Sequence, residues 1–200
     1  MSQVDLWYLS RATGMVALVL LTATTFLGVL VAGRARSSLP PFARADVHRR
    51  VSALTVVFLA IHVVTAVLDT YVHIGWLAVA VPFTSSYDRV GIAVGAVGTD
   101  LVMAVAVSSA LRAKLPAHVW RWLHWLAYLS WPVALSHTLA MGPDTGFAWS
   151  ICLVTACTAL VAGAALWRLV AAFKARSGRP VTAVSPRRSL RAAHITGDAD

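Results

Sequence analysis

The chain has 200 residues, of which 58% are hydrophobic and 12% charged, with 17 Lys and Arg against eight acidic residues, all of them Asp. This composition excludes an ordinary soluble domain and indicates an integral membrane protein. The net charge of +9 does not indicate nucleic-acid binding, because the basic residues lie between apolar blocks, as topology signals do. Cys152 and Cys157 lie five residues apart in one apolar block, which excludes a CxxC redox pair and a thiolate zinc site.

Five apolar blocks of about 20 residues or more are each long enough to cross a hydrocarbon core of about 30 Å. They predict an all-α membrane protein, a bundle of five transmembrane helices at Thr13–Ala32, Val51–Tyr71, Val90–Leu111, Val119–Leu139 and Phe147–Phe173. A shorter apolar piece from His73 to Phe83 is broken by Pro82 and predicts an interfacial segment.

The distribution of Lys and Arg predicts the orientation of the bundle. Alternate loops place 15 of the 17 basic residues on one side, and only Arg11 and Arg89 on the other. Because basic residues mark the cytoplasmic side, we expect the N-terminus outside and the C-terminus in the cytoplasm of a multi-pass protein of the cell membrane. Residues 1–176 then form the transmembrane bundle, and the polar, Arg-rich residues 177–200 form a basic, disordered cytoplasmic tail.

Four of the seven histidines form two pairs within the predicted spans. The spacing is i, i+14 for His48 and His62 on the second span and i, i+13 for His124 and His137 on the fourth. These separations correspond to about 21 and 20 Å along a helix. Both spans run outward, so His48 and His124 lie near the cytoplasmic face and His62 and His137 lie further out. A single histidine in a membrane is more often a helix–helix hydrogen bonder, but two pairs at matching depths favour ligation.

Neutral imidazole is a natural axial ligand of haem iron, and iron held by two of them has no open site, which favours electron transfer. Zinc or copper competes poorly, because ligands about 20 Å apart cannot share an ion and no thiolate or carboxylate accompanies them. The spacing along the helix places only the first pair, His48 and His62, on one face of its helix. A spacing of i, i+14 returns to within about 40° of the starting direction, whereas i, i+13 misses it by about 140°. Pro132 lies between His124 and His137, and a proline kink is a physical way to change that phase.

Two stretches, HRRVSALTVVFLAIHVVTAVLD and RWLHWLAYLSWPVALSH, resemble the haem-binding spans of the ferric reductase-like transmembrane domain family. SRATG at Ser10–Gly14 is similar to the opening of actinobacterial-type members. The family includes ferric reductases, NADPH oxidases and the haem-binding subunit of bacterial methionine sulfoxide reductase systems. The resemblance implies two b-type haems in a bacterial plasma membrane, the inner one on His48 and His124 and the outer one on His62 and His137.

Large members of that family continue into a cytoplasmic flavin and nicotinamide domain. Here about 27 polar residues follow Phe173, and they contain no GxGxxG or other nucleotide loop. We therefore expect a separate electron donor, either a flavoprotein reductase or quinol, and an acceptor on the outer side.

Several further polar residues are candidates for the site. Haem propionates are anionic and need cationic partners. The candidates are Arg49, Arg50 and Arg121 for the inner haem and Arg11 and Arg89 for the outer one. Each of these arginines is also explained as a determinant of membrane topology. Gly91, Gly95 and Gly98 permit close helix packing or make room for a porphyrin. Asp100 falls near the centre of the third span, where a carboxylate should bond to a hydroxyl group on a neighbouring helix or act as a proton relay.

Two other functions stay open at this level. Asp100 and the histidines could form the polar path of a proton or metal-ion channel or transporter. Alternatively, the bundle could be a haem-free membrane anchor for a partner, which would tolerate loss of all four histidines.

Overall fold

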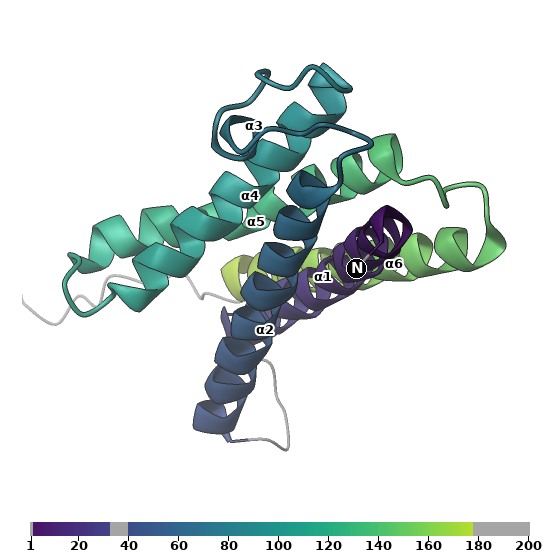
Figure 1. Ribbon diagram of the computed structural model, residues 1–200. Helices are drawn as coiled ribbons and strands as arrows, with labels where there is room; N and C mark the ends of the chain where they lie inside the picture. Colours follow the sequence, from purple (N-terminus) through teal and green to yellow (C-terminus); the bar gives the residue numbers. More distant parts are fainter. Residues whose placement is uncertain (1, 33–39, 178–200) are drawn as a thin grey trace, which may run out of the picture.

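The computed structural model describes residues 2–32 and 40–177, and within these ranges all regular structure is helical. Five long helices and one short one follow in chain order (Figure 1): α1 (Gln3–Ala32), α2 (Pro41–Leu68), α3 (Leu77–Ala80), α4 (Arg89–Ala110), α5 (Ala117–Met141) and α6 (Ala148–Ser177). The predicted basic tail, residues 177–200, lies outside the described residues except for Ser177, which ends α6.

Each predicted span coincides with one long helix, but the ends differ. α2 ends at Leu68, three residues before the predicted Tyr71, and Leu111 and Phe147 lie just outside α4 and α6. The largest difference is at α1, which begins at Gln3, well before Thr13, because a capping box closes its first turn. The Ser2 backbone N–H donates to the Asp5 carboxylate at 2.8 Å, and the Asp5 N–H donates to the Ser2 hydroxyl at 3.2 Å. The predicted interfacial segment contains α3, a single turn that packs against α4.

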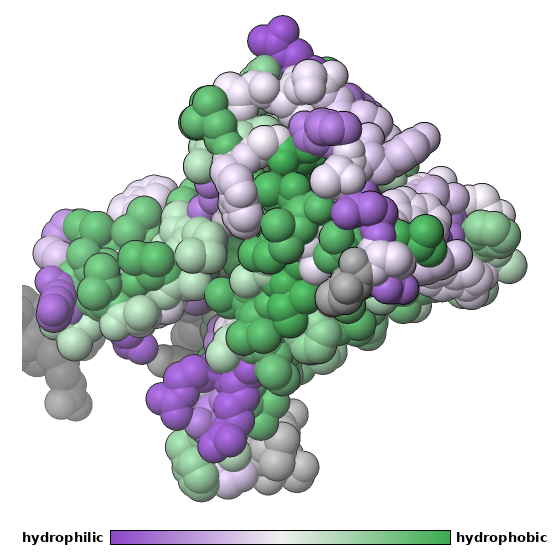
Figure 2. Space-filling view, viewed as in Figure 1, coloured by the Kyte–Doolittle hydropathy of each residue, from purple (hydrophilic) through white to green (hydrophobic). Residues whose placement is uncertain are grey.

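Four of the described helices, α1, α2, α4 and α6, are long and apolar enough to cross a membrane, as expected of a multi-pass protein. The remaining long helix, α5, has 25 residues, so its length suffices. Its tryptophans, histidines and Arg121 leave it without an 18-residue stretch as hydropathic as those of the other four long helices. Its crossing of the membrane, and with it the count of five spans, therefore stays a prediction. Figure 2 shows strongly hydrophobic residues through the middle of the visible face, with hydrophilic ones at several of its outer edges.

The long helices pack mainly as two antiparallel pairs, α1 with α2 and α4 with α5, and α6 lies against α1. The two pairs contact each other far less than the helices within each pair do. At the middle of the molecule the pairs meet through a small core in which Leu21 of α1, Trp131 of α5 and Cys157 of α6 are buried. The Trp131 indole N–H donates to the Thr22 hydroxyl at 2.9 Å. This contact ties α5 to α1 halfway between the two levels at which the histidines lie.

Candidate functional site

The four histidines of the two predicted pairs face one another across the interface between the helix pairs. The ring centres of His48 and His124 are 6.4 Å apart, with the ring planes at 75°. Those of His62 and His137 are 6.3 Å apart, with the planes at 71°. Each pair therefore takes one ring from α2 and one from α5. We call His48 with His124 the inner pair and His62 with His137 the outer pair, after the predicted orientation.

These separations match the distance that a shared metal ion requires. A metal–imidazole bond is about 2.0 Å long and the bonded nitrogen lies about 1.1 Å from the ring centre, so two imidazoles on opposite sides of one ion have centres about 6.3 Å apart. Stacked rings lie closer, as Trp120 and His124 do at 4.9 Å, whereas rings packed edge to face have centres about 4.5–7 Å apart. The separation of each pair therefore fits two imidazoles on one ion, and it also lies within the range of edge-to-face packing.

Hydrogen bonds fix which nitrogen of each outer ring is free. His62 Nδ1 lies 2.8 Å from the Ser10 carbonyl oxygen, and His137 Nδ1 lies 2.9 Å from that of Gly91. A carbonyl oxygen can only accept, so Nδ1 carries the proton in both rings and Nε2 keeps its lone pair. A backbone carbonyl in this position is the usual outer partner of a metal-binding histidine. The outer pair is therefore held in the tautomer that ligation needs.

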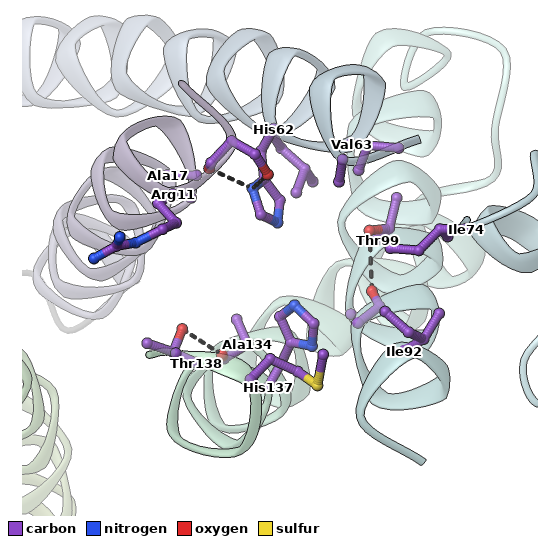
Figure 3. A pocket seen from close by; sticks show the side chains of 18 of the residues that line it. Arg11, Ala17, His62, Val63, Ile74, Ile92, Thr99, Ala134, His137 and Thr138 are labelled. Carbon is purple, nitrogen blue, oxygen red and sulfur yellow. Dashed lines mark hydrogen bonds between the residues drawn. The ribbon is translucent and has the colours of Figure 1, made fainter. Parts of the chain in front are cut away.

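Each outer ring lies against a glycine on the neighbouring helix, where a Cβ atom would collide with it. A Cβ at Gly14 of α1 would lie 2.9 Å from His62 Nδ1, and one at Gly95 of α4 would lie 2.7 Å from His137 Cε1. In both cases the accepting carbonyl belongs to the residue four positions before the glycine. Figure 3 shows His62 and His137 projecting from opposite sides toward the space between them.

The inner pair is built less uniformly. His48 packs over Gly28, where a Cβ would lie 3.4 Å from its Cε1, and its Nδ1 faces the backbone of Thr24 without meeting hydrogen-bond geometry. His124 stacks on Trp120 of its own helix, with the ring planes at 21°. The guanidinium of Arg112 lies over the Trp120 ring, 4.3 Å from its centre. His124 Nδ1 and the Trp120 indole nitrogen are buried and have no hydrogen-bond partner among the residues described.

The i, i+13 spacing predicts that the rings of His124 and His137 point in different directions from α5. In the structure each ring packs against a different neighbour. The helix continues unbroken through Pro132. His137 leans on α4 through Gly91 and Gly95, whereas His124 rests on Trp120 one turn away on α5 itself. Both rings consequently lie opposite a histidine of α2, although their spacing is not a whole number of helical turns.

Sequence reasoning missed the glycines of α1. Gly14 and Gly28 have the same spacing as His48 and His62, and on antiparallel helices equal spacing brings each glycine to one histidine. This matched spacing was readable in the sequence. For α4, room for a porphyrin was one of two expectations, and Gly95 is the glycine that lies against a histidine ring.

A cavity of about 340 Å³ adjoins the outer pair and is lined by residues from α1, α2, α4 and α5. This volume lies in the usual range of ligand pockets, about 300–1,000 Å³. His62, His137, Gly14 and Gly95 line it, together with Arg11 and Asp144. Arg11 forms an ion pair with Asp144, and its guanidinium lies over Trp7, 4.0 Å from the ring centre. Of the predicted propionate partners, Arg11 thus borders the outer site and already has a carboxylate partner.

The other candidate residues lie at the surface. Arg49 and Arg50 are exposed and both bond to Asp46, Arg89 is exposed and donates to the Phe83 carbonyl at 2.8 Å, and Arg121 is exposed. Asp100 is exposed and does not line the cavity, although its neighbour Thr99 does. The expected hydroxyl partner of Asp100 is not found among the described residues.

No group of three or more His, Cys, Asp or Glu side chains that could hold a metal ion occurs in residues 2–32 and 40–177. Each histidine pair therefore supplies two ligands only. Comparison with protein-family models, with curated proteins and with solved structures finds no match to this chain.

Proposed function

We propose that the protein is a membrane b-type cytochrome that carries electrons through two haems, each held by two histidines. The observation that carries this proposal is that two levels of the molecule each bring one imidazole of α2 opposite one of α5, at ring-centre separations of 6.4 and 6.3 Å, a spacing at which both rings would reach one iron. A bare metal ion would need further protein ligands, whereas iron in a porphyrin needs only two. The proposal places the chain with the ferric reductase-like transmembrane family that its histidine spans resemble.

Three features of the chain support a fit to haem. The helix pairs that carry the facing histidines touch each other little, and a cavity of about 340 Å³ lies beside the outer pair. Gly14, Gly28 and Gly95 keep the ring positions clear of Cβ atoms. Buried nitrogens without an acceptor, Trp120 Nε1 and Arg168 Nη1, are donors of the kind that an anionic propionate satisfies.

The protein residues have three tasks in this function. His48 with His124 and His62 with His137 would bind the two irons, and the Ser10 and Gly91 carbonyls orient the outer rings. The apolar helices around them exclude water, which lowers the local dielectric and so tunes the reduction potential. When bound, haem supplies one-electron oxidation and reduction, and the protein supplies position, ligand and environment.

The proposed topology has five spans, with the N-terminus outside and the C-terminus in the cytoplasm. The two pairs are then about 20 Å apart along the helices, a distance that covers most of a hydrocarbon core of about 30 Å. We infer that a flavoprotein reductase or quinol reduces the inner side, and that an acceptor on the outer side is reduced in turn.

The alternative of a channel or transporter receives no support from the position of Asp100. A polar path needs the carboxylate and the imidazoles to line one passage, but Asp100 is exposed on the outside of α4 and does not line the cavity of the outer pair. No observation favours the haem-free anchor, since an anchor gives no reason for two facing pairs at a metal-binding distance.

Single-histidine variants test the proposal. His62→Ala or His137→Ala should remove the outer haem and retain the inner one, so that haem per chain falls by about half; the loss of an axial ligand leaves iron with one bond to the protein. His48→Ala or His124→Ala should remove the inner haem. The matched control is His118→Ala on α5, whose ring is exposed and which should keep both haems. Equal haem content in all five variants would refute the ligand assignment.

A further inference from the structure

Asp100 differs from every other aspartate that the structure describes. Five of the six have a hydrogen-bond or ion-pair partner within the chain: Asp5 with Ser2, Asp46 with Arg49 and Arg50, Asp69 with the Tyr71 N–H, Asp88 with the Gly91 N–H, and Asp144 with Arg11. These five lie near helix ends. Asp100 alone among them has no such contact with any described residue, and it lies halfway along a membrane helix.

The surroundings of Asp100 are apolar. Its face of α4 carries Val97, Met103 and Val107, whose exposed fractions are 37%, 43% and 50%. Asp100 lies about three turns, or about 16 Å, from the first residue of the helix, so the carboxylate lies near the middle of a hydrocarbon core about 30 Å thick. Charged side chains at this depth are costly and are almost always turned inward or paired. Asp100 is turned outward and has no partner among the described residues, so its position is open to a partner from another chain.

We propose that this face of α4 binds a transmembrane helix of a partner protein that presents a basic side chain at mid-depth to Asp100. An opposite charge favours the ionised carboxylate, and a hydrocarbon setting strengthens the attraction because water does not screen it. A second copy related by a twofold axis through this face would bring two Asp100 carboxylates together, which is repulsive. The contact is independent of haem binding, since Asp100 does not line the cavity of the outer pair.

The probe for this contact is a synthetic transmembrane peptide of Leu and Ala with one central Lys. A matched peptide carries Leu in place of the Lys. The full-length protein, labelled at its N-terminus, is reconstituted in phosphatidylcholine vesicles, and association with labelled peptide is measured by energy transfer. We expect the wild-type protein to bind the Lys peptide at least about tenfold more tightly than the Leu peptide, and Asp100→Leu to abolish that difference. Asp100→Glu should preserve it because the charge remains.

Val107→Leu changes the same exposed face two turns away and is the matched control, for which the tenfold preference should persist. Each variant is first shown to keep the unfolding midpoint of the wild type, which is expected because Asp100 is exposed and has no described partner to lose. Equal binding of the two peptides by the wild-type protein would overturn the proposal. Self-association of the protein that Asp100→Leu removes would also overturn it and would assign the face to a second copy.

Discussion

One methyl group added at Gly95 should weaken haem binding at the outer site and leave the inner site unchanged. In Gly95→Ala the new Cβ would lie 2.7 Å from His137 Cε1 and 2.8 Å from its Nδ1. The ring would have to move by about 0.7 Å to bring its nearest atom, Cε1, to an ordinary contact of 3.4 Å. Metal–ligand distances tolerate only about 0.2 Å, and loss of an orienting contact typically costs 10–100-fold in metal affinity. We therefore expect the outer haem to dissociate at least about tenfold more readily, while the inner haem is retained.

The assay is haem content per chain after purification and dilution, followed by a redox titration that resolves the two haems. Gly98→Ala is the matched control on the same helix, because its Cβ would lie 3.5 Å from the nearest side-chain atom, Val133 Cγ1, and should be accommodated. Retention of both haems in Gly95→Ala, or equal loss in Gly98→Ala, would refute the role assigned to the glycine.

Two further predictions concern stability. Thr22→Val leaves the buried Trp131 indole N–H without its acceptor and should lower the free energy of unfolding by about 1–3 kcal/mol, measured by thermal unfolding in detergent. Thr22→Ser keeps the hydroxyl and should lower it much less. Equal unfolding midpoints for the two variants would contradict this. Asp144→Asn removes the negative partner of Arg11, a side chain that is only 25% exposed, and should also cost about 1–3 kcal/mol. Asp46→Asn, whose arginine partners are 81% and 77% exposed, should change the midpoint far less, and a larger effect at Asp46 than at Asp144 would overturn that ranking.

The apolar blocks and the histidine depths could be predicted from the sequence because both depend on local pattern. A block of about 20 apolar residues predicts a membrane span without reference to any other part of the chain. The pairing of His48 with His124 and of His62 with His137 required only the direction of two spans and the helical rise. The beginning of α1 was missed, although Ser2 and Asp5 have the spacing of a capping box, because hydropathy marks the apolar block and not the helix end.

The supports of the rings were harder to predict, because they depend on which helix lies beside which. The carbonyl that receives His62 Nδ1 is 52 residues away, and the carboxylate that binds Arg11 is 133 residues away. The helical phase of α5 predicted that His124 and His137 point apart, but it could not predict that each ring rests on a different support. Whether the Asp100 side chain points into the bundle or out of it depends on how α4 is rotated about its own axis. That rotation is set by the packing of α4 against α5.

The absorbance spectrum of the purified protein, oxidised and then reduced, with haem quantified against protein, tests the central claim most directly. Two facing imidazole pairs predict the spectrum of a low-spin b-type cytochrome with about two haems per chain. A colourless protein, after expression with an adequate supply of haem, would contradict the account.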